Sequence, residues 1–377
     1  MFYIYFYILI WEKSILGQFV GINDIHAETK TENLQHCSSV DGPTDAVILD
    51  KTKWSKSLIS SNKIAVPDTV YVEVFIVIDE ILADEIGKSY SNGKWNKYGT
   101  NPMLPIGNPS KETELYLRKF MTAVNARFED QFSSPKIKLH ISGLYNGKHL
   151  SFYMKAKDDK NAMDVFETLY QMTFYYNESF RKKQNTDIAL YLTGQHRLCK
   201  GYCKIGSLFQ DQYKGASYQN GACLDIKSYS GYGGVAIVKD FGAFSGVTLA
   251  VHQIGHLLGA EEDGNNNPCC SEKGYIMTNH TTADGSLYRN NFKWSICSVK
   301  AINKFLSSPR AAECLYNKPK RTNHRLLRYQ DLIGPNVPTV ADQCSVMKKP
   351  SGKGLIINWA QLYKNKHLNQ VYSQLKS

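Results

Sequence analysis

The sequence predicts an α/β fold in which a twisted, mostly parallel sheet is covered by helices. Strand-like and helix-like segments alternate along the first half of the chain. The strand-like segments are rich in β-branched and apolar residues, and 42% of the 377 residues are hydrophobic, so a folded core is expected. Alternation of this kind is typical of strands joined by crossover helices.

The first predicted unit is strand, loop, helix and strand. VYVEVFIVIDE, residues 70–80, is β-branched and apolar and predicts a buried strand. Gly, Asn, Ser and Pro predict a loop over 88–109. Ser110 is expected to cap a helix whose apolar residues recur every three or four positions. KIKLHISGLY, residues 136–145, alternates as a half-buried strand.

The remaining elements follow in the same way. A second helix is predicted over 161–181, and TDIALYLTG, residues 186–194, predicts a third strand. Short strand-like pieces rich in Gly and Tyr occupy 216–240. A helix is expected from about 246 to 258, where Gly259 stops it, and a last helix over 298–306.

Charge and targeting features favour a secreted protein. The formal net charge of +11 favours anionic partners, but nucleic acid is not expected because no basic-aromatic repeat or zinc finger is present. The apolar run MFYIYFYILIW is too short to span a bilayer, and residues 1–27 are predicted to be a signal peptide. The alternative is a hydrophobic N-terminus from an incomplete gene model. We expect no transmembrane anchor and a monomer.

The cysteines also favour an oxidising compartment. Seven of the nine lie between 199 and 314, which suits disulfide bonds, and the odd count leaves at least one cysteine unpaired within the chain. Sequons predict glycosylation at Asn177 and Asn279, as expected of an extracellular protein.

HQIGHLLGAEED, residues 252–263, carries the candidate chemistry. On a helix, His252 and His256 lie one turn apart on the same face, as zinc requires of two nitrogen ligands. Gly259 allows a sharp bend that can return position 262 toward them. GYIM follows, with Met277 in a turn-like segment. The alternative is a helix whose two histidines are partly exposed and bind nothing.

These motifs resemble the reprolysin (adamalysin) family of metzincin zinc metalloproteinases, which includes secreted arthropod venom enzymes. The similarity extends from about Val66 to Pro319 and includes FKWSICSVKAINKFL, ECLYNKP and QNGACLDIKSYSG. It implies a peptidase domain at 66–319 with an α/β metzincin fold. Residues 28–65 are then a short pro-segment or leader remnant, and 320–377 a basic linker with a truncated disintegrin-like remnant.

The resemblance also implies specific sites. Zinc would lie on His252, His256 and position 262, with Met277 beneath the metal and Asp263 supporting the turn. Cys223 would pair with Cys314, and Cys297 with Cys269 or Cys270, while Cys199 and Cys203 pair locally or with a neighbour. A structural calcium ion would use the oxygen ligands Glu73, Asp187, the carbonyl of Cys314, and Asn317.

Two residues depart from the family pattern. Gln253 stands where the general-base glutamate belongs, and a glutamine has no oxygen that carries a proton at neutral pH. Glu262 replaces the third histidine but can still ligate zinc. The sequence therefore predicts a secreted, venom-type zinc metalloendopeptidase homologue with impaired catalysis on protein substrates. The alternatives are a pseudoprotease toxin that binds host or matrix proteins, and a basic protein that binds anionic surfaces.

Overall fold

The protein is described from a computed structural model of the chain. The predicted signal peptide 1–27, Cys37, the two sequons at Asn177 and Asn279, and everything after 328 lie outside the described residues. The described residues are 46–47, 65–90, 109–147, 150–176, 186–205, 208–209, 213–224, 233–242, 244–265, 267–278, 290–320, 322 and 324–328.

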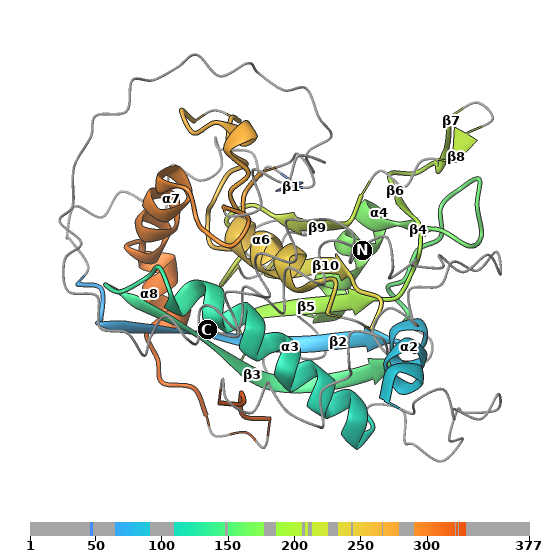
Figure 1. Ribbon diagram of the computed structural model, residues 1–377, viewed down its shortest axis with the longest axis horizontal. Coiled ribbons are helices and arrows are strands. Elements are labelled where there is room, and N and C mark those ends of the chain that lie inside the picture. The colour runs from blue at the N-terminus through green and yellow to red at the C-terminus, as the bar shows by residue number, and fades with distance from the viewer. Residues whose placement is uncertain are drawn as a thin grey trace, which may run out of the picture.

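A six-stranded sheet in the order β1-β9-β10-β5-β2-β3 forms the centre of the molecule (Figure 1). Four neighbouring strands are parallel, whereas β9 is antiparallel to β10 and pairs in parallel with the short β1. The strands are β1 (Ala46–Val47), β2 (Thr69–Asp79), β3 (Lys136–Gly147), β5 (Ile188–Thr193), β9 (Gly215–Tyr218) and β10 (Val235–Lys239).

Helices cover both faces of this sheet. One buried cluster joins α3 (Lys111–Glu129) and α6 (Val247–Leu257) to one side of β2, and a second joins α4 (Val165–Tyr176) to the other side. This is the mostly parallel α/β architecture that the sequence predicted. The other helices are α2 (Glu80–Tyr90), η3 (Ser271–Lys273), α7 (Ile296–Leu306) and α8 (Pro309–Leu315).

Two small sheets lie beside the main one. They pair β4 (Met163–Asp164) with β6 (Leu198–Cys199), and β7 (Lys204–Ile205) with β8 (Leu208–Phe209). Within the described part of the chain, no helix is long and apolar enough to cross a membrane.

Several elements begin or end differently from their predicted bounds. Ser110 caps α3 as expected, because its Oγ accepts a hydrogen bond from the Thr113 amide at 3.1 Å. Helix α4 begins at 165 rather than 161, since residues 163–164 pair with β6, and the rest of the predicted helix, 177–181, lies outside the described residues. The sequence did not predict α2, which follows β2 without a loop.

Among the described residues, three disulfides have both of their cysteines placed. Cys223 is bonded to Cys314 across 91 residues, the pairing that the resemblance implied. Cys297 is bonded to Cys269, which resolves the choice between Cys269 and Cys270. Cys199 and Cys203 are bonded to each other, and Cys270 is also disulfide-bonded.

Candidate metal centre

Helix α6 holds two histidines whose rings are fixed by backbone carbonyls. The Nδ1 atom of His252 lies 2.8 Å from the carbonyl oxygen of Ile276, and that of His256 lies 2.9 Å from the carbonyl of Ala260. Because a carbonyl oxygen only accepts hydrogen bonds, each Nδ1 must carry the proton. In the neutral rings, both Nε2 atoms are therefore unprotonated and basic, which is the state that binds a metal.

The two Nε2 atoms face each other at 3.0 Å. Two nitrogen lone pairs at this distance repel unless a proton or a cation lies between or beside them. Glu262 supplies a third ligand atom, and the ligand atoms of the three residues all lie within 4.8 Å of one another. All three side chains are buried, so the histidines are not the partly exposed pair of the alternative interpretation. This donor set fits zinc.

The bend after the helix depends on Gly259. Its φ of +100° lies in the region that favours glycine, and a Cβ there would lie 2.8 Å from Oδ1 of Asn220. The turn brings the carbonyl of Ala260 back to the ring of His256. Gly259 thus both ends α6 and completes the support of the second histidine.

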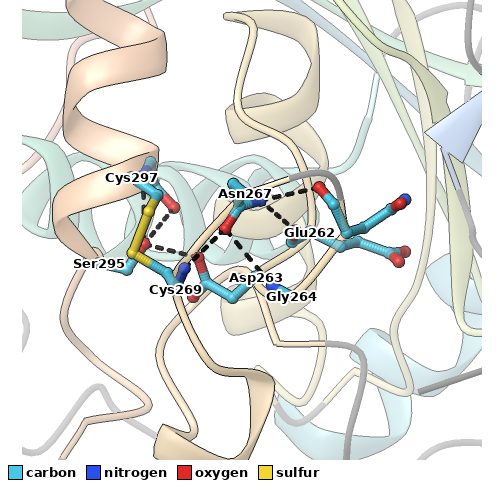
Figure 2. The surroundings of a disulfide bond; sticks show 9 residues. Glu262, Asp263, Gly264, Asn267, Cys269, Ser295 and Cys297 are labelled. Carbon is cyan, nitrogen blue, oxygen red and sulfur yellow. Dashed lines mark hydrogen bonds between the residues drawn. A yellow bond between two sulfur atoms is a disulfide. The ribbon is translucent and has the colours of Figure 1, made fainter. Parts of the chain in front are cut away.

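The loop that carries Glu262 is organised by Asn267, as Figure 2 shows. The Nδ2 group of Asn267 donates to the Glu262 carbonyl at 2.7 Å and to the Asn265 carbonyl at 2.9 Å. Its Oδ1 accepts from the amides of Gly264 and Cys269, at 3.4 and 3.1 Å. The Cys269–Cys297 disulfide then joins this loop to α7. The backbone at Glu262 is therefore fixed from two directions.

Asp263 supports the same turn from inside the protein. Its Oδ1 accepts a hydrogen bond from Ser295, the residue that caps α7, at 2.6 Å, and its amide donates to the Met277 carbonyl at 2.9 Å. Burial raises the pKa of the Asp263 carboxyl to about 6, against the opposing effects of Ser295, His252 and Ser298. The structure thus places Asp263 where it links the ligand loop, the methionine turn and α7.

Met277 lies directly against the histidine helix. It is fully buried, and a Cβ at Gly255 would lie 2.9 Å from its sulfur and 2.8 Å from the Trp294 ring. Only glycine at 255 leaves room for both side chains. The turn therefore contacts α6 between the two histidines along the chain, and Ile276 in that turn supplies the carbonyl for His252.

Gln253 is a residue of α6, and its side chain lies against the strand β9. The side chain is fully buried, and a Cβ at Gly215 would lie 3.4 Å from both its Cγ and its Nε2. Burying a neutral amide at such a position costs less free energy than burying an ionised carboxylate.

The residues proposed for calcium also come together, on another part of the sheet. The amide of Glu73 donates to Oδ2 of Asp187 at 2.8 Å, and Nδ2 of Asn317 donates to Oε2 of Glu73 at 3.2 Å. Asn317 follows shortly after Cys314, whose disulfide anchors the end of α8. Turning the Asn317 amide would present its oxygen beside the Glu73 carboxylate, and oxygen ligands of this kind suit calcium.

Other supporting residues were not predicted from the sequence. The carbonyls of Ile276 and Ala260 belong to the backbone, so residue types do not reveal their role. From the sequence, Ser295 could have been identified only as a helix cap. Asn267 lies within the run GNNNPCC, where the letters do not show which asparagine organises the loop.

The chain is similar to several known proteins. Residues 153–319 match the family described as "Reprolysin (M12B) family zinc metalloprotease". The Bombyx mori protein "A disintegrin and metalloproteinase with thrombospondin motifs like" is 27% identical over 290 residues, 71% of this chain and 36% of that protein. "Venom metalloproteinase 3" of Eulophus pennicornis is 28% identical over 214 residues, 54% of this chain and 47% of that protein.

A solved structure is also similar, although weakly. Metalloproteinase-II from Bacteroides fragilis aligns with a TM-score of 0.35 and 15% identity, over 67% of this chain and 60% of that one. A TM-score this low does not define the fold, which rests on the sheet order and the family match. The chain spans less than half the length of the two relatives above. Over residues 153–319, the chain is similar to the reprolysin family of zinc metalloproteases.

Proposed function

We propose that the chain is a secreted, venom-type zinc metalloendopeptidase homologue that holds its metal on His252, His256 and Glu262. The observation that carries this proposal is the pair of bare Nε2 atoms, 3.0 Å apart and next to a buried carboxylate. Two imidazoles and one carboxylate form the catalytic zinc set of other peptidases. Relatives that are venom metalloproteinases support secretion and protein substrates.

Catalysis is expected to be impaired at one identifiable group. Zinc bound here would polarise a peptide carbonyl and lower the pKa of water in the site. Gln253 can hydrogen-bond to what lies beside it, but it cannot accept a proton and pass it on. General acid–base catalysis is worth about 10²–10⁴ in rate, so peptide hydrolysis should be slower by that order.

The replacement at 262 has a milder effect. An anionic carboxylate neutralises more of the metal's charge than a neutral imidazole does, so the site should bind zinc while polarising its other ligands less. Asn267 and the Cys269–Cys297 disulfide fix the loop that presents this carboxylate. These contacts favour a site that still binds a metal over one that has lost this ability.

A second candidate function is a pseudoprotease that binds host or matrix proteins in the former substrate cleft. The specific observation that favours it is the complete burial of Gln253 against Gly215 of β9. The site is thereby adapted to a neutral side chain. On this alternative the fold, the disulfides and the metal would serve binding alone.

We also propose the remaining features that the sequence predicted. Residues 66–319 form the peptidase domain, 28–65 a short pro-segment, and 320–377 the segment that follows the domain. Glu73, Asp187 and Asn317 form a structural calcium site with the Cys314 carbonyl, which is supported by the contacts of Glu73 with Asp187 and with Asn317. The protein acts as a monomer.

Zinc titration of the purified protein tests the proposed function. We expect one zinc ion per chain, and its loss in His256→Gln. In His140→Gln, a matched change at a histidine on β3, binding should be unchanged. A wild-type protein that takes up no zinc would contradict the proposal. If zinc binds, chelator-sensitive cleavage of a broad protein substrate separates the slow peptidase from the pseudoprotease.

A further inference from the structure

The segment after the family domain lies along the edge of the sheet. Its described residues, 318–320, 322 and 324–328, follow α8 and run beside β3 and α3 (orange in Figure 1). We call these residues the strap. Nε2 of His140 lies 3.0 Å from the Lys320 carbonyl, and Thr322 Oγ1 donates to the Ile141 carbonyl at 2.8 Å. Both contacts place the strap against β3.

Further hydrogen bonds fix the strap to α3. Nε of Arg118 donates to the Arg325 carbonyl at 2.7 Å, and the Leu327 amide donates to Oγ1 of Thr122 at 2.9 Å. His324 lies 3.1 Å from a carboxylate oxygen of Glu114. The side chain of Leu326 packs against the main core. The strap is therefore a fixed part of the surface in this structure.

This arrangement gathers positive charge at one edge of the molecule. Six exposed cations lie there, Arg328 of the strap among them, and among the described residues the other five have no ion-pair partner. Carboxylates also lie beside the surface: Asp68, whose carbonyl accepts from the Lys136 amide, Glu114, which faces His324, and the buried Glu73, which accepts from Asn317. Positive charge is therefore in excess. The five are Lys136 and Lys138 on β3, and Lys318, Lys320 and Arg325 on the strap.

The shape of the surface indicates which anion it fits. Lys136 and Lys138 lie on the same face of β3, so their Cα atoms are about 7 Å apart. Lys320 on the strap lies beside His140, the next residue on that face. The large apolar side chains that are exposed in the described residues, Ile81, Tyr170, Tyr202 and Ile296, lie elsewhere. Among its described residues, the surface therefore offers no large exposed apolar side chain to insert into a bilayer or to stack on bases.

We propose that the β3 edge and the strap form a binding surface for a linear sulfated polysaccharide, separate from the metal centre. A flexible polyanion can follow a row of cations and release its counterions, and binding weakens as salt rises. The surface would hold the protein on sulfated glycans of the extracellular matrix or cell surface. Nothing in this proposal depends on zinc or on peptide hydrolysis.

Heparin binding by the full chain tests the proposal. Lys136→Glu/Lys138→Glu/Lys320→Glu should bind heparin at least about tenfold more weakly than wild type at physiological salt. The matched control is Lys155→Glu/Lys300→Glu/Lys304→Glu, three exposed lysines outside this surface. It lowers the formal net charge equally, from +11 to +5, because each reversal changes the charge by two. The control should lose less than about twofold.

A charge-neutral variant tests the role of the strap itself. Thr122→Val/Thr322→Val removes two of its hydrogen bonds and should weaken heparin binding while melting temperature and net charge change little. Equal losses in the two lysine triples would overturn the proposal, because net charge alone would then account for binding. So would wild-type binding to phosphatidylserine vesicles or single-stranded DNA that equals or exceeds heparin binding. Loss of binding to desulfated heparin would support it.

Discussion

The Nε2 atoms of His252 and His256 lie 3.0 Å apart because each Nδ1 is bound to a backbone carbonyl. This orientation is imposed from outside the helix, by Ile276 in the methionine turn and by Ala260 after the Gly259 bend. The helix alone places both rings on one face, but the two carbonyls set the orientation of the rings, so that the Nε2 atoms face each other. A site built in this way exists before any metal arrives, which lowers the cost of binding.

Glu262 should be required for metal binding, whereas its neighbour Glu261 should not. Glu262→Gln removes the one carboxylate among the three candidate zinc ligands and should weaken zinc binding by at least about tenfold. Glu261→Gln removes the same charge one residue earlier and is the matched control. Isothermal titration with zinc measures both. Equal losses in the two variants would show that general charge, rather than ligation, attracts the ion.

Asn267 should act on the metal through the backbone of Glu262. Asn267→Ala removes four hydrogen bonds in the ligand loop and should weaken zinc binding by about 10–100-fold, as losses of outer supporting residues do. Asn267→Asp keeps the acceptor for Gly264 and Cys269 but loses the donor to Glu262. Its affinity should fall between wild type and alanine. An unchanged zinc affinity in both variants would contradict this role.

The long-range disulfide should contribute more to stability than the local one. Cys223→Ser/Cys314→Ser opens a separation of 91 residues, and chain-entropy arguments assign such a bond about 4–5 kcal/mol. Cys199→Ser/Cys203→Ser opens a separation of 4, for which the same relation gives about 2 kcal/mol. Denaturant unfolding of both variants compares them. A larger loss of unfolding free energy in Cys199→Ser/Cys203→Ser than in Cys223→Ser/Cys314→Ser would contradict this prediction.

Calcium should stabilise the protein through Glu73, Asp187 and Asn317. The melting temperature should rise on adding calcium, because the folded state alone presents the oxygen ligands together. Asp187→Asn should abolish that rise. Asp68→Asn, which removes an exposed carboxylate from the chain leading into β2, should leave it intact. A calcium effect that survives Asp187→Asn would place the ion elsewhere.

Much of the fold was predictable because its signals are local. The apolar strands and the capping at Ser110 depend on neighbouring letters, and the structure has both. Helix α2 was missed, although its signal is local too. The carboxylate of Asp79 accepts from the Leu82 amide at 2.8 Å, and the buried Leu82 and Ile86 are four residues apart. Because β2 leads directly into α2, the apolar residues of the strand and of the helix form one continuous run in the sequence.

The metal centre was predictable only in part. Helical spacing brings His252 and His256 together, and the glycine indicates the bend. What the sequence left open depends on contacts between distant segments. The choice of Cys269 over Cys270 cannot follow from spacing, because the two residues are adjacent. The contacts of Asn267, and of Asp263 with Ser295, likewise require the loop to meet α7 in space.

The central claim is that the family's metal site is retained while its proton carrier is lost at position 253. Peptide hydrolysis by wild type and Gln253→Glu, each loaded with one zinc ion per chain, tests it most directly. We predict that the variant cleaves about 10²–10⁴ times faster and that a chelator abolishes the gain. Chelator-sensitive cleavage by wild type at the rate of the variant would contradict the claim. So would a zinc-loaded variant that is no faster than wild type.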